Sequence, residues 1–271
     1  MRLRLVISLF VGVFSLSQSA YAQFDATAIL NALTNQINTP TAQTAIRALI
    51  TITSLSSDHR AYQPASPLGT SVGIDMGLEL TAISIPQNLI TDISNAVGST
   101  SLSTLPAVPV PKLHLHKGLG MLDVGVSYLG FLPRPYQVYQ IWGGDAKLTI
   151  INPDQGLIWA LRLNYTYSSF DLIKTSTWTP QVLASIKLDF AEPYAGIGYQ
   201  IATGTISGTL SQTVLVVTVS APISASGIAS AFQGFGGVGF KLGPSGIKLS
   251  LEMAYNTTKM NHLGAKLSLC F

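Results

Sequence analysis

The sequence is poor in charged residues and almost free of cysteine. Asp, Glu, Lys and Arg make up 10% of the 271 residues, against about 25% in typical soluble domains. No Lys/Arg cluster of the kind that neutralises phosphates is present, so nucleic acid is not an expected partner. The single cysteine, Cys270, excludes an internal disulfide.

Recognisable catalytic motifs are missing as well. The patterns G-x-S-x-G and H-E-x-x-H and a phosphate-binding loop do not occur. His114 and His116 lie two apart on one face of an expected strand, with Asp123 on the next, a spacing that can hold a metal. Histidines beside a turn are more often polar rim residues, and neither His59 nor His262 has an obvious partner. The sequence therefore predicts no enzyme, no cofactor and no metal site.

The first 22 residues have the pattern of a secretory signal peptide. Arg2 and Arg4 precede an apolar run over 5–16, and small residues over 20–22 end before Gln23. The run is shorter than the roughly 20 residues that a membrane-spanning helix needs. No cysteine follows to accept a lipid. The mature chain is expected to begin at Gln23, with thirteen basic and twelve acidic residues.

Residues 23–67 are expected to form a helical segment and linker ahead of the main domain. Apolar residues at four-residue spacing predict a first helix from about residue 25, which Thr39-Pro40 interrupts. Ile46, Leu49 and Ile50 predict a second helix that ends near residue 56. Two interpretations are open: a periplasmic cap or extension, or a plug inside the following domain.

From residue 68 to the end, the pattern has a period of two. Over 68–82 the even positions are apolar and the odd positions are polar or small. The alternation returns at 122–128, 157–167, 182–190, 247–255 and 263–271. A further strand is placed at about 109–116, and its prolines make it the weakest strand prediction. Strands of this length suit a bilayer-spanning sheet, since soluble strands average about five to six residues. We therefore predict an all-β fold, an antiparallel transmembrane β-barrel of about ten strands over 68–271.

The strand number should be even, because both termini are expected on the periplasmic side. Short turns are predicted at 152–156, 191–193 and 243–246, and longer outer loops at 86–108, 131–138, 168–177, 204–229 and 256–261. Aromatic residues fall near both expected strand ends, with Trp142 and Trp178 at one and Trp159 and Tyr194 at the other. Such girdles are typical of lipid interfaces.

Inward strand positions carry six acidic and six basic residues. They are Asp75, Glu79, Asp123, Asp145, Asp189 and Glu252, and Lys147, Arg162, Lys187, Lys241, Lys248 and Lys266. Pairing across the lumen would order the interior, whereas separated walls of opposite charge would line a path for solutes. Lys266 on the last strand is expected beside Asp75 and Glu79 on the first. Inward glycines either widen the lumen or let a helix approach.

The signal peptide, the alternating strands and the final residues 266–271 together resemble bacterial outer-membrane β-barrel proteins. Leu267, Leu269 and Phe271 are similar to the C-terminal signal that the barrel-assembly machinery binds. The segments 117–119, 160–162 and 192–196 resemble uncharacterised small barrels of Gram-negative bacteria. The resemblance implies an outer-membrane location and contact with its lipid.

The sequence indicates the location of the protein more clearly than its function. The first hypothesis is a porin-like barrel, or one that transports a small solute or a hydrophobic substrate. The alternative is a non-catalytic structural or surface-interaction barrel. The helical segment and an apolar stretch over 214–232 are compatible with hydrophobic transport.

Overall fold

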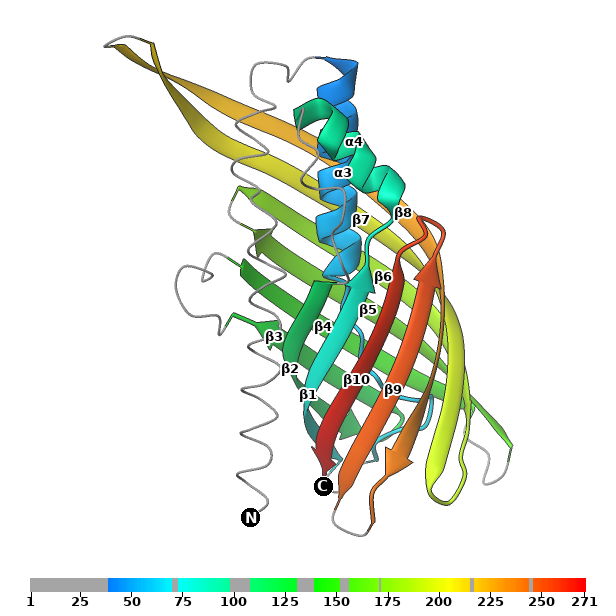
Figure 1. Cartoon of the computed structure of the whole chain (residues 1–271). Coiled ribbons are helices and arrows are strands. Elements are labelled where there is room, and N and C mark those ends of the chain that lie inside the picture. Colours follow the sequence, from blue (N-terminus) through cyan, green and yellow to red (C-terminus); the bar gives the residue numbers. More distant parts are fainter. Residues whose placement is uncertain are drawn as a thin grey trace.

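The chain forms a closed antiparallel β-barrel of ten strands (Figure 1). The computed structural model describes residues 39–69, 73–97, 108–130, 139–151, 156–170, 172–214, 217–243 and 246–271. The strands are β1 (Ile74–Ser84), β2 (Val108–Leu119), β3 (Leu122–Leu129), β4 (Tyr139–Ile151), β5 (Leu157–Phe170), β6 (Ile173–Ile186), β7 (Ala191–Val214), β8 (Val217–Lys241), β9 (Ile247–Asn256) and β10 (Asn261–Cys270). The predicted fold class and strand number are confirmed.

The barrel closes because β1 pairs with β10. The pairing runs from Asp75 opposite Cys270 to Ser84 opposite Asn261, so neither the first nor the last strand has an unpaired edge. Each remaining strand pairs with its sequence neighbour. The end that holds Phe271 is called the C-terminal end here, and the opposite end is called the helix end (Figure 1).

Two helices occupy the helix end, α3 (Pro40–Ser56) and α4 (Gln87–Val97). Thr39 caps α3, since its hydroxyl accepts a hydrogen bond from the Ala42 amide at 3.2 Å. Pro40 occupies the first turn, where a missing amide hydrogen costs nothing. The second predicted helix is therefore confirmed, while the first lies outside the described residues, as does the signal peptide.

Helix α3 packs inside the mouth of the barrel. Its buried side chains, Leu49 and Ile50 among them, form one hydrophobic cluster with Ile93 of α4 and with inward residues of β6, β7 and β8 such as Ala202. The cap interpretation placed this segment at the end that holds the C-terminus, which was expected to be periplasmic. That interpretation is wrong for residues 40–56, which pack at the opposite end.

Two predicted outer loops are strands instead. Residues 204–214 and 217–229 belong to a long hairpin of β7 and β8, with 24 and 25 residues, that projects beyond the other strands at the helix end (Figure 1). Residues 168–177 mostly extend β5 and β6. The turn predicted at 191–193 is shifted as well, because β7 already begins at Ala191. The outer loop predicted at 131–138 and residues 152–155 of the turn predicted at 152–156 lie outside the described residues.

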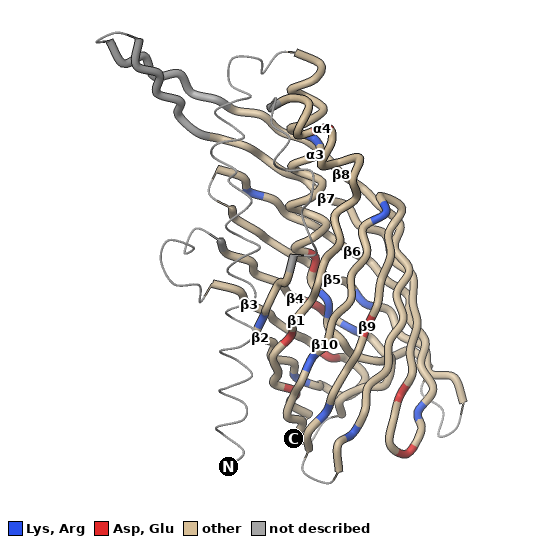
Figure 2. The backbone as a smooth tube through the Cα atoms, viewed as in Figure 1, with Lys and Arg blue, Asp and Glu red and all other residues tan. Residues whose placement is uncertain are grey.

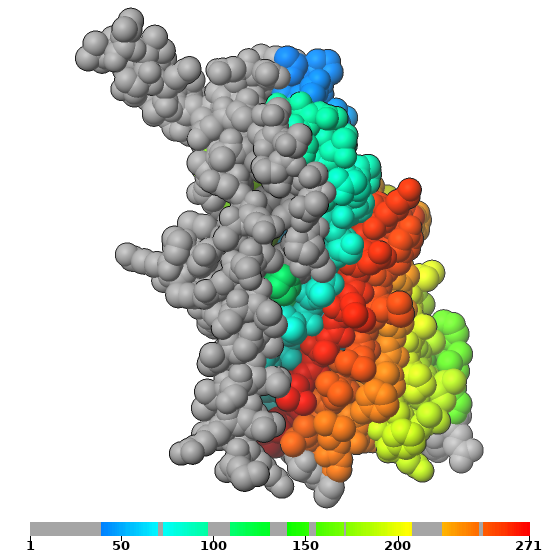
Figure 3. All heavy atoms as spheres, viewed as in Figure 1, coloured from blue at the N-terminus to red at the C-terminus, as the bar shows by residue number. Residues whose placement is uncertain are grey.

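The outward face of the strands is apolar. Its charged residues, within the described strands, are Lys117 and Lys174, and each lies within two residues of a strand end. Leu267, Leu269 and Phe271 all face outward and are exposed. In Figure 3 the outer surface of β1, β9 and β10 runs without a break from α4 to the C-terminal end. No helix in the described ranges is long and apolar enough to cross a membrane.

The aromatic residues follow the expected arrangement with one exception. Trp142 and Trp178 are exposed toward the helix end, and Trp159 and Phe190 toward the C-terminal end. Tyr194 instead points into the barrel, where its hydroxyl donates to Glu252 at 2.9 Å. It occupies an inward position of β7, so its assignment to an outer girdle is wrong.

Candidate functional site

An extended stretch of chain fills the barrel interior. After α3 ends, residues 57–67 run down the lumen toward the C-terminal end, where Gly69 bridges to Gly120 before β1 begins (Figure 1). This stretch is called the lumen segment. Residues 57–65 are all buried. The plug interpretation placed the obstruction in the helices, whereas in the structure the irregular residues that follow α3 fill the lumen.

Inward side chains of the strands hold the segment by its backbone. Lysines supply most of these bonds: Lys112 donates to Asp58 O at 3.0 Å, Lys266 to Ala61 O at 3.0 Å, and Lys147 to Pro64 O at 2.9 Å and Ser66 O at 2.7 Å. Arg162, Asn164 and Thr149 donate to the carbonyls of Gln63, His59 and Ala65. An extended segment cannot pair its own backbone groups, so these donors replace the water that it gave up.

Side chains of the segment are paired as well. Arg60 reaches Glu252 at 3.3 Å, and Asp58 accepts hydrogen bonds from Thr179 at 2.9 Å and Gln200 at 2.8 Å. The Tyr62 hydroxyl contacts Thr81. Four elements of the wall therefore bind one short stretch of chain, and buried charge pairs of this kind are costly to break from one side.

The predicted lumen charges divide into two groups. Eight are buried inside the barrel: Asp75, Glu79, Asp123, Asp145, Lys147, Arg162, Glu252 and Lys266. The other four lie toward the C-terminal end, with Lys187, Asp189 and Lys241 exposed and Lys248 half-buried (Figure 2). The inward assignment is wrong for the three exposed residues, because β6 ends at Ile186 and Lys241 is the last residue of β8.

The sequence predicted that Lys266 lies beside Asp75 and Glu79 where the last strand meets the first, a contact called the closing seam. The closing seam is present in part. Lys266 Nζ lies 3.4 Å from an oxygen of Asp75. Glu79 is opposite Lys266 in the strand register, but its ion pairs are with Lys112 at 3.9 Å and with His114. Lys266 also donates a hydrogen bond to the lumen segment, so one ammonium group binds both the closing seam and the segment.

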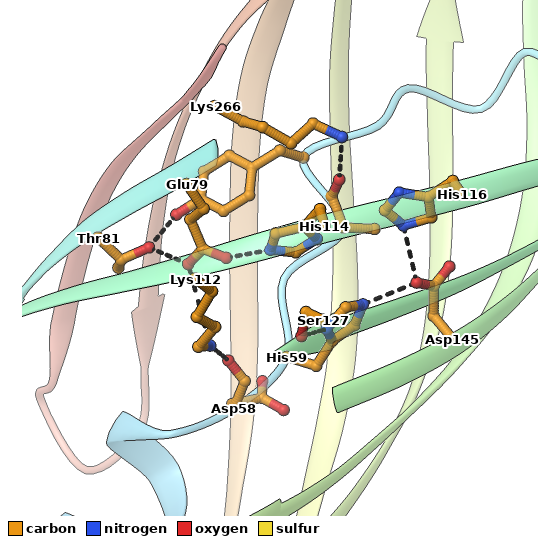
Figure 4. Close-up of polar contacts among 12 residues, drawn as sticks. Asp58, His59, Glu79, Thr81, Lys112, His114, His116, Ser127, Asp145 and Lys266 are labelled. Carbon is orange, nitrogen blue, oxygen red and sulfur yellow. Dashed lines mark hydrogen bonds and ion pairs between the residues drawn. The ribbon is translucent and has the colours of Figure 1, made fainter. Parts of the chain in front are cut away.

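A compact histidine cluster lies beside the segment (Figure 4). His114 and His116 project from β2, and His59 reaches them from the lumen segment. His59 contacts Ser127 and Asp145, each at 2.7 Å, and His116 contacts Asp145 at 3.0 Å. Asp123, the carboxylate that the spacing suggested, pairs instead with Lys147 at 2.9 Å.

Inward glycines give the segment its space. A Cβ atom on Gly264 would overlap the Tyr62 hydroxyl, and one on Gly143 would overlap the His59 ring. These positions face the lumen on β10 and β4. These two glycines thus admit the extended segment, while Gly204 of β7 lies against Ile50 and admits helix α3.

Sequence reasoning missed the role of His59. Nothing within ten residues of it supplies its partners, since Ser127 and Asp145 come from β3 and β4. One signal was available for the segment as a whole. Residues 57–67 combine charged and aromatic side chains between a helix and a barrel strand, a composition suited to a polar lumen.

No protein-family model matches the chain, and no curated protein is a significant match. Solved structures do show similarity. Neisserial surface protein A has a TM-score of 0.31 at 11% identity over 73% of this chain and 96% of that one. The barrel domain of Pseudomonas aeruginosa OprF gives 0.32 at 9%, over 73% and 97%. The KdgM porin in complex with oligogalacturonate gives 0.33 at 8%, over 73% and 99%. Similarities this weak carry no information about function.

Proposed function

We propose that the protein is an integral barrel of the bacterial outer membrane, closed at rest by its lumen segment, and that it passes a small solute when the segment moves. The apolar outward face supports the membrane location, because charge is expensive there and is confined to strand ends. Polar small residues and charges line the interior, as in barrels that enclose water.

The observation that carries the proposal is the way the segment is held. Its backbone is held by hydrogen bonds to carbonyls, which any extended segment offers, and among its side chains only Ala65 belongs to an apolar cluster of the described core. Each such bond contributes about 0.5–1.5 kcal/mol net, and about 1.5–3 kcal/mol when the donor is charged. Water that enters the lumen can replace these backbone bonds, while the buried pairs of Arg60 and Asp58 oppose release, so the segment is a suitable gate that stays closed at rest.

Planar-bilayer conductance tests this proposal. Arg162→Met, Asn164→Leu and Thr149→Val together remove three donors to the segment and leave no acidic partner unpaired. We expect the triple variant to conduct ions far more often than the wild type. Ser250→Ala with Ser268→Ala is the matched control, because both hydroxyls face inward and neither has a hydrogen-bond partner among the described residues.

A disulfide lock completes the test. A Cβ on Gly204 would lie 2.6 Å from Ile50 Cγ2, so Ile50→Cys and Gly204→Cys, made with Cys270→Ser, place two thiols within bridging reach. The oxidised lock should abolish the conductance of the triple variant, and reduction should restore it. A triple variant that folds and never conducts would overturn the transport proposal.

A surface-interaction role is the second candidate. The apolar cluster of α3, α4 and inward residues of β6, β7 and β8 builds a folded unit at the helix end, and the β7–β8 hairpin projects beyond it (Figure 1). The absence of conductance in the wild type and in every variant would favour this role. Binding of a partner to the intact barrel, lost when the projecting hairpin is shortened, would then support it.

A further inference from the structure

Three of the four histidines in the chain meet at one point in the lumen. His59, His114 and His116 are buried, and one ligand nitrogen from each lies within 4.8 Å of the others. The ring centroids are 5.3 Å apart for His59 and His114, and 5.6 Å apart for His114 and His116. Two of these residues belong to the wall and one to the lumen segment.

Carboxylates bind the outer side of the cluster (Figure 4). Glu79 contacts His114 Nε2, and Asp145 contacts Nε2 of both His116 and His59. The Nδ1 atoms of His114 and His116 are buried and have no hydrogen-bond partner among the described residues. A carboxylate on one ring nitrogen and a free lone pair on the other is the arrangement found around metal-bound histidines.

Charge in the interior also favours a cation. The buried charged residues of the described chain comprise six carboxylates and five Lys or Arg side chains. The carboxylates are Asp58, Asp75, Glu79, Asp123, Asp145 and Glu252, and the bases are Arg60, Lys112, Lys147, Arg162 and Lys266. Asp145 contacts two imidazoles rather than a Lys or Arg side chain, and its second oxygen has no hydrogen-bond partner among the described residues. Buried charges need a counter-charge, and a cation among the histidines supplies one.

We propose that His59, His114 and His116 bind one divalent transition-metal ion of the zinc type. Imidazole nitrogens suit such ions, and Zn–N bonds of about 2.0–2.1 Å bring three ligand nitrogens to roughly 3.4 Å from one another. The rings therefore close inward by about 1 Å, and His59 exchanges one of its present contacts for the ion. Glu79 and Asp145 hold the rings in orientation.

Such an ion joins the lumen segment to β2. Because His59 is on the segment and the other two ligands are on the wall, metal binding holds the segment inside the barrel. The effect on gating rests on the proposed function, whereas the binding itself does not. Zinc should lower the conductance of the anchor-weakened triple variant, and a chelator should restore it.

The binding test uses the full-length folded barrel in detergent, without a histidine tag and after treatment with a chelator. Zn²⁺ is titrated against a chromophoric competitor, and Co²⁺ serves as a spectroscopic probe of tetrahedral nitrogen ligation. We expect one ion per barrel, and a loss of affinity of more than about 100-fold in His59→Ala and His114→Ala. Glu79→Gln, which keeps all three histidines but weakens the contact of Glu79 with His114 and its ion pair with Lys112, should cost about 10–100-fold.

His262→Ala is the matched control, since His262 is a buried lumen histidine outside the cluster. It should keep the wild-type affinity and the Co²⁺ absorption. If His114→Ala fails to assemble, His59→Ala still decides, because His59 is not part of the barrel wall. Wild-type protein that binds no stoichiometric Zn²⁺, or His59→Ala protein that binds it equally well, overturns the site. If the protein binds Zn²⁺ but no variant conducts ions, the transport proposal is overturned and the metal site is not.

Discussion

Buried lysines in this barrel serve as multiple donors rather than as partners of a single acid. The Lys147 ammonium reaches Asp123 at 2.9 Å together with the carbonyls of Pro64 and Ser66. An ammonium has three hydrogens, so all of its donor capacity is used. A buried charge satisfied in this way fixes the position of the neutral backbone that it binds.

Phe271 offers a test at the level of one residue. Its side chain is exposed beyond the last strand, and the resemblance to outer-membrane barrels implies that the assembly machinery binds it. Phe271→Ser should reduce the folded barrel in membranes several-fold without reducing export, measured by heat-modifiable gel migration and by periplasmic fractionation. Phe190→Ser is the control, since Phe190 is an equally exposed aromatic at the same end. Equal loss in both variants would argue against a terminal signal.

Single residues show where sequence reasoning stops. The inward positions of Asp75, Glu79 and Glu252 follow from a period of two, because a strand alternates its faces. Their partners do not follow, since partners depend on which chain segment enters the lumen. For the same reason the pairing of His59 with Asp145, separated by 86 residues, leaves no trace in local spacing.

At the level of elements, α3 ties the lumen segment to the barrel mouth. Leu49 is completely buried in its cluster. Leu49→Ala should weaken the docking of α3 by about 2–5 kcal/mol. The measurement is hydrogen exchange of the α3 amides in detergent-solubilised protein. Gln43→Ala, on the exposed face of the same helix, should leave the exchange unchanged. An equal change in both variants would mean that Leu49 packing does not hold the helix.

Elements were predictable where one physical pattern dominates. The membrane-length strands obey alternation, and β2 forms despite Pro109 and Pro111, which the sequence made its weakest strand. The β7–β8 hairpin was mistaken for a loop because serine, threonine and glycine give it little hydrophobic contrast. Helix α4 had a usable signal that was overlooked: Leu89, Ile90 and Ile93 follow helical spacing.

Within the described residues, the chain runs from one end of the barrel to the other an odd number of times. Ten strands and the lumen segment make eleven passages, so the start of α3 and the C-terminus lie at opposite ends (Figure 1). The even strand number was inferred from an expected periplasmic position of both termini; ten strands confirm the number, while the start of the mature chain lies outside the described residues. A count of strands alone cannot include a passage through the lumen.

Sidedness can be measured with an impermeant maleimide on intact cells. In a Cys270→Ser background, Thr41→Cys at the exposed start of α3 should be labelled at once. Asp189→Cys, in the exposed turn at the C-terminal end, should react only after permeabilisation. Labelling of both, or of Asp189→Cys alone, would contradict the proposed orientation in the outer membrane.

The β1–β10 seam also orders events during folding. Residues 57–67 continue directly toward β1, yet they lie within the ring that β1 completes. Once that ring is hydrogen-bonded, α3 with its apolar face has no route past the narrow, charged interior. We therefore expect the segment to enter the lumen while the wall is still open, so that the β1–β10 pair forms after the lumen is filled.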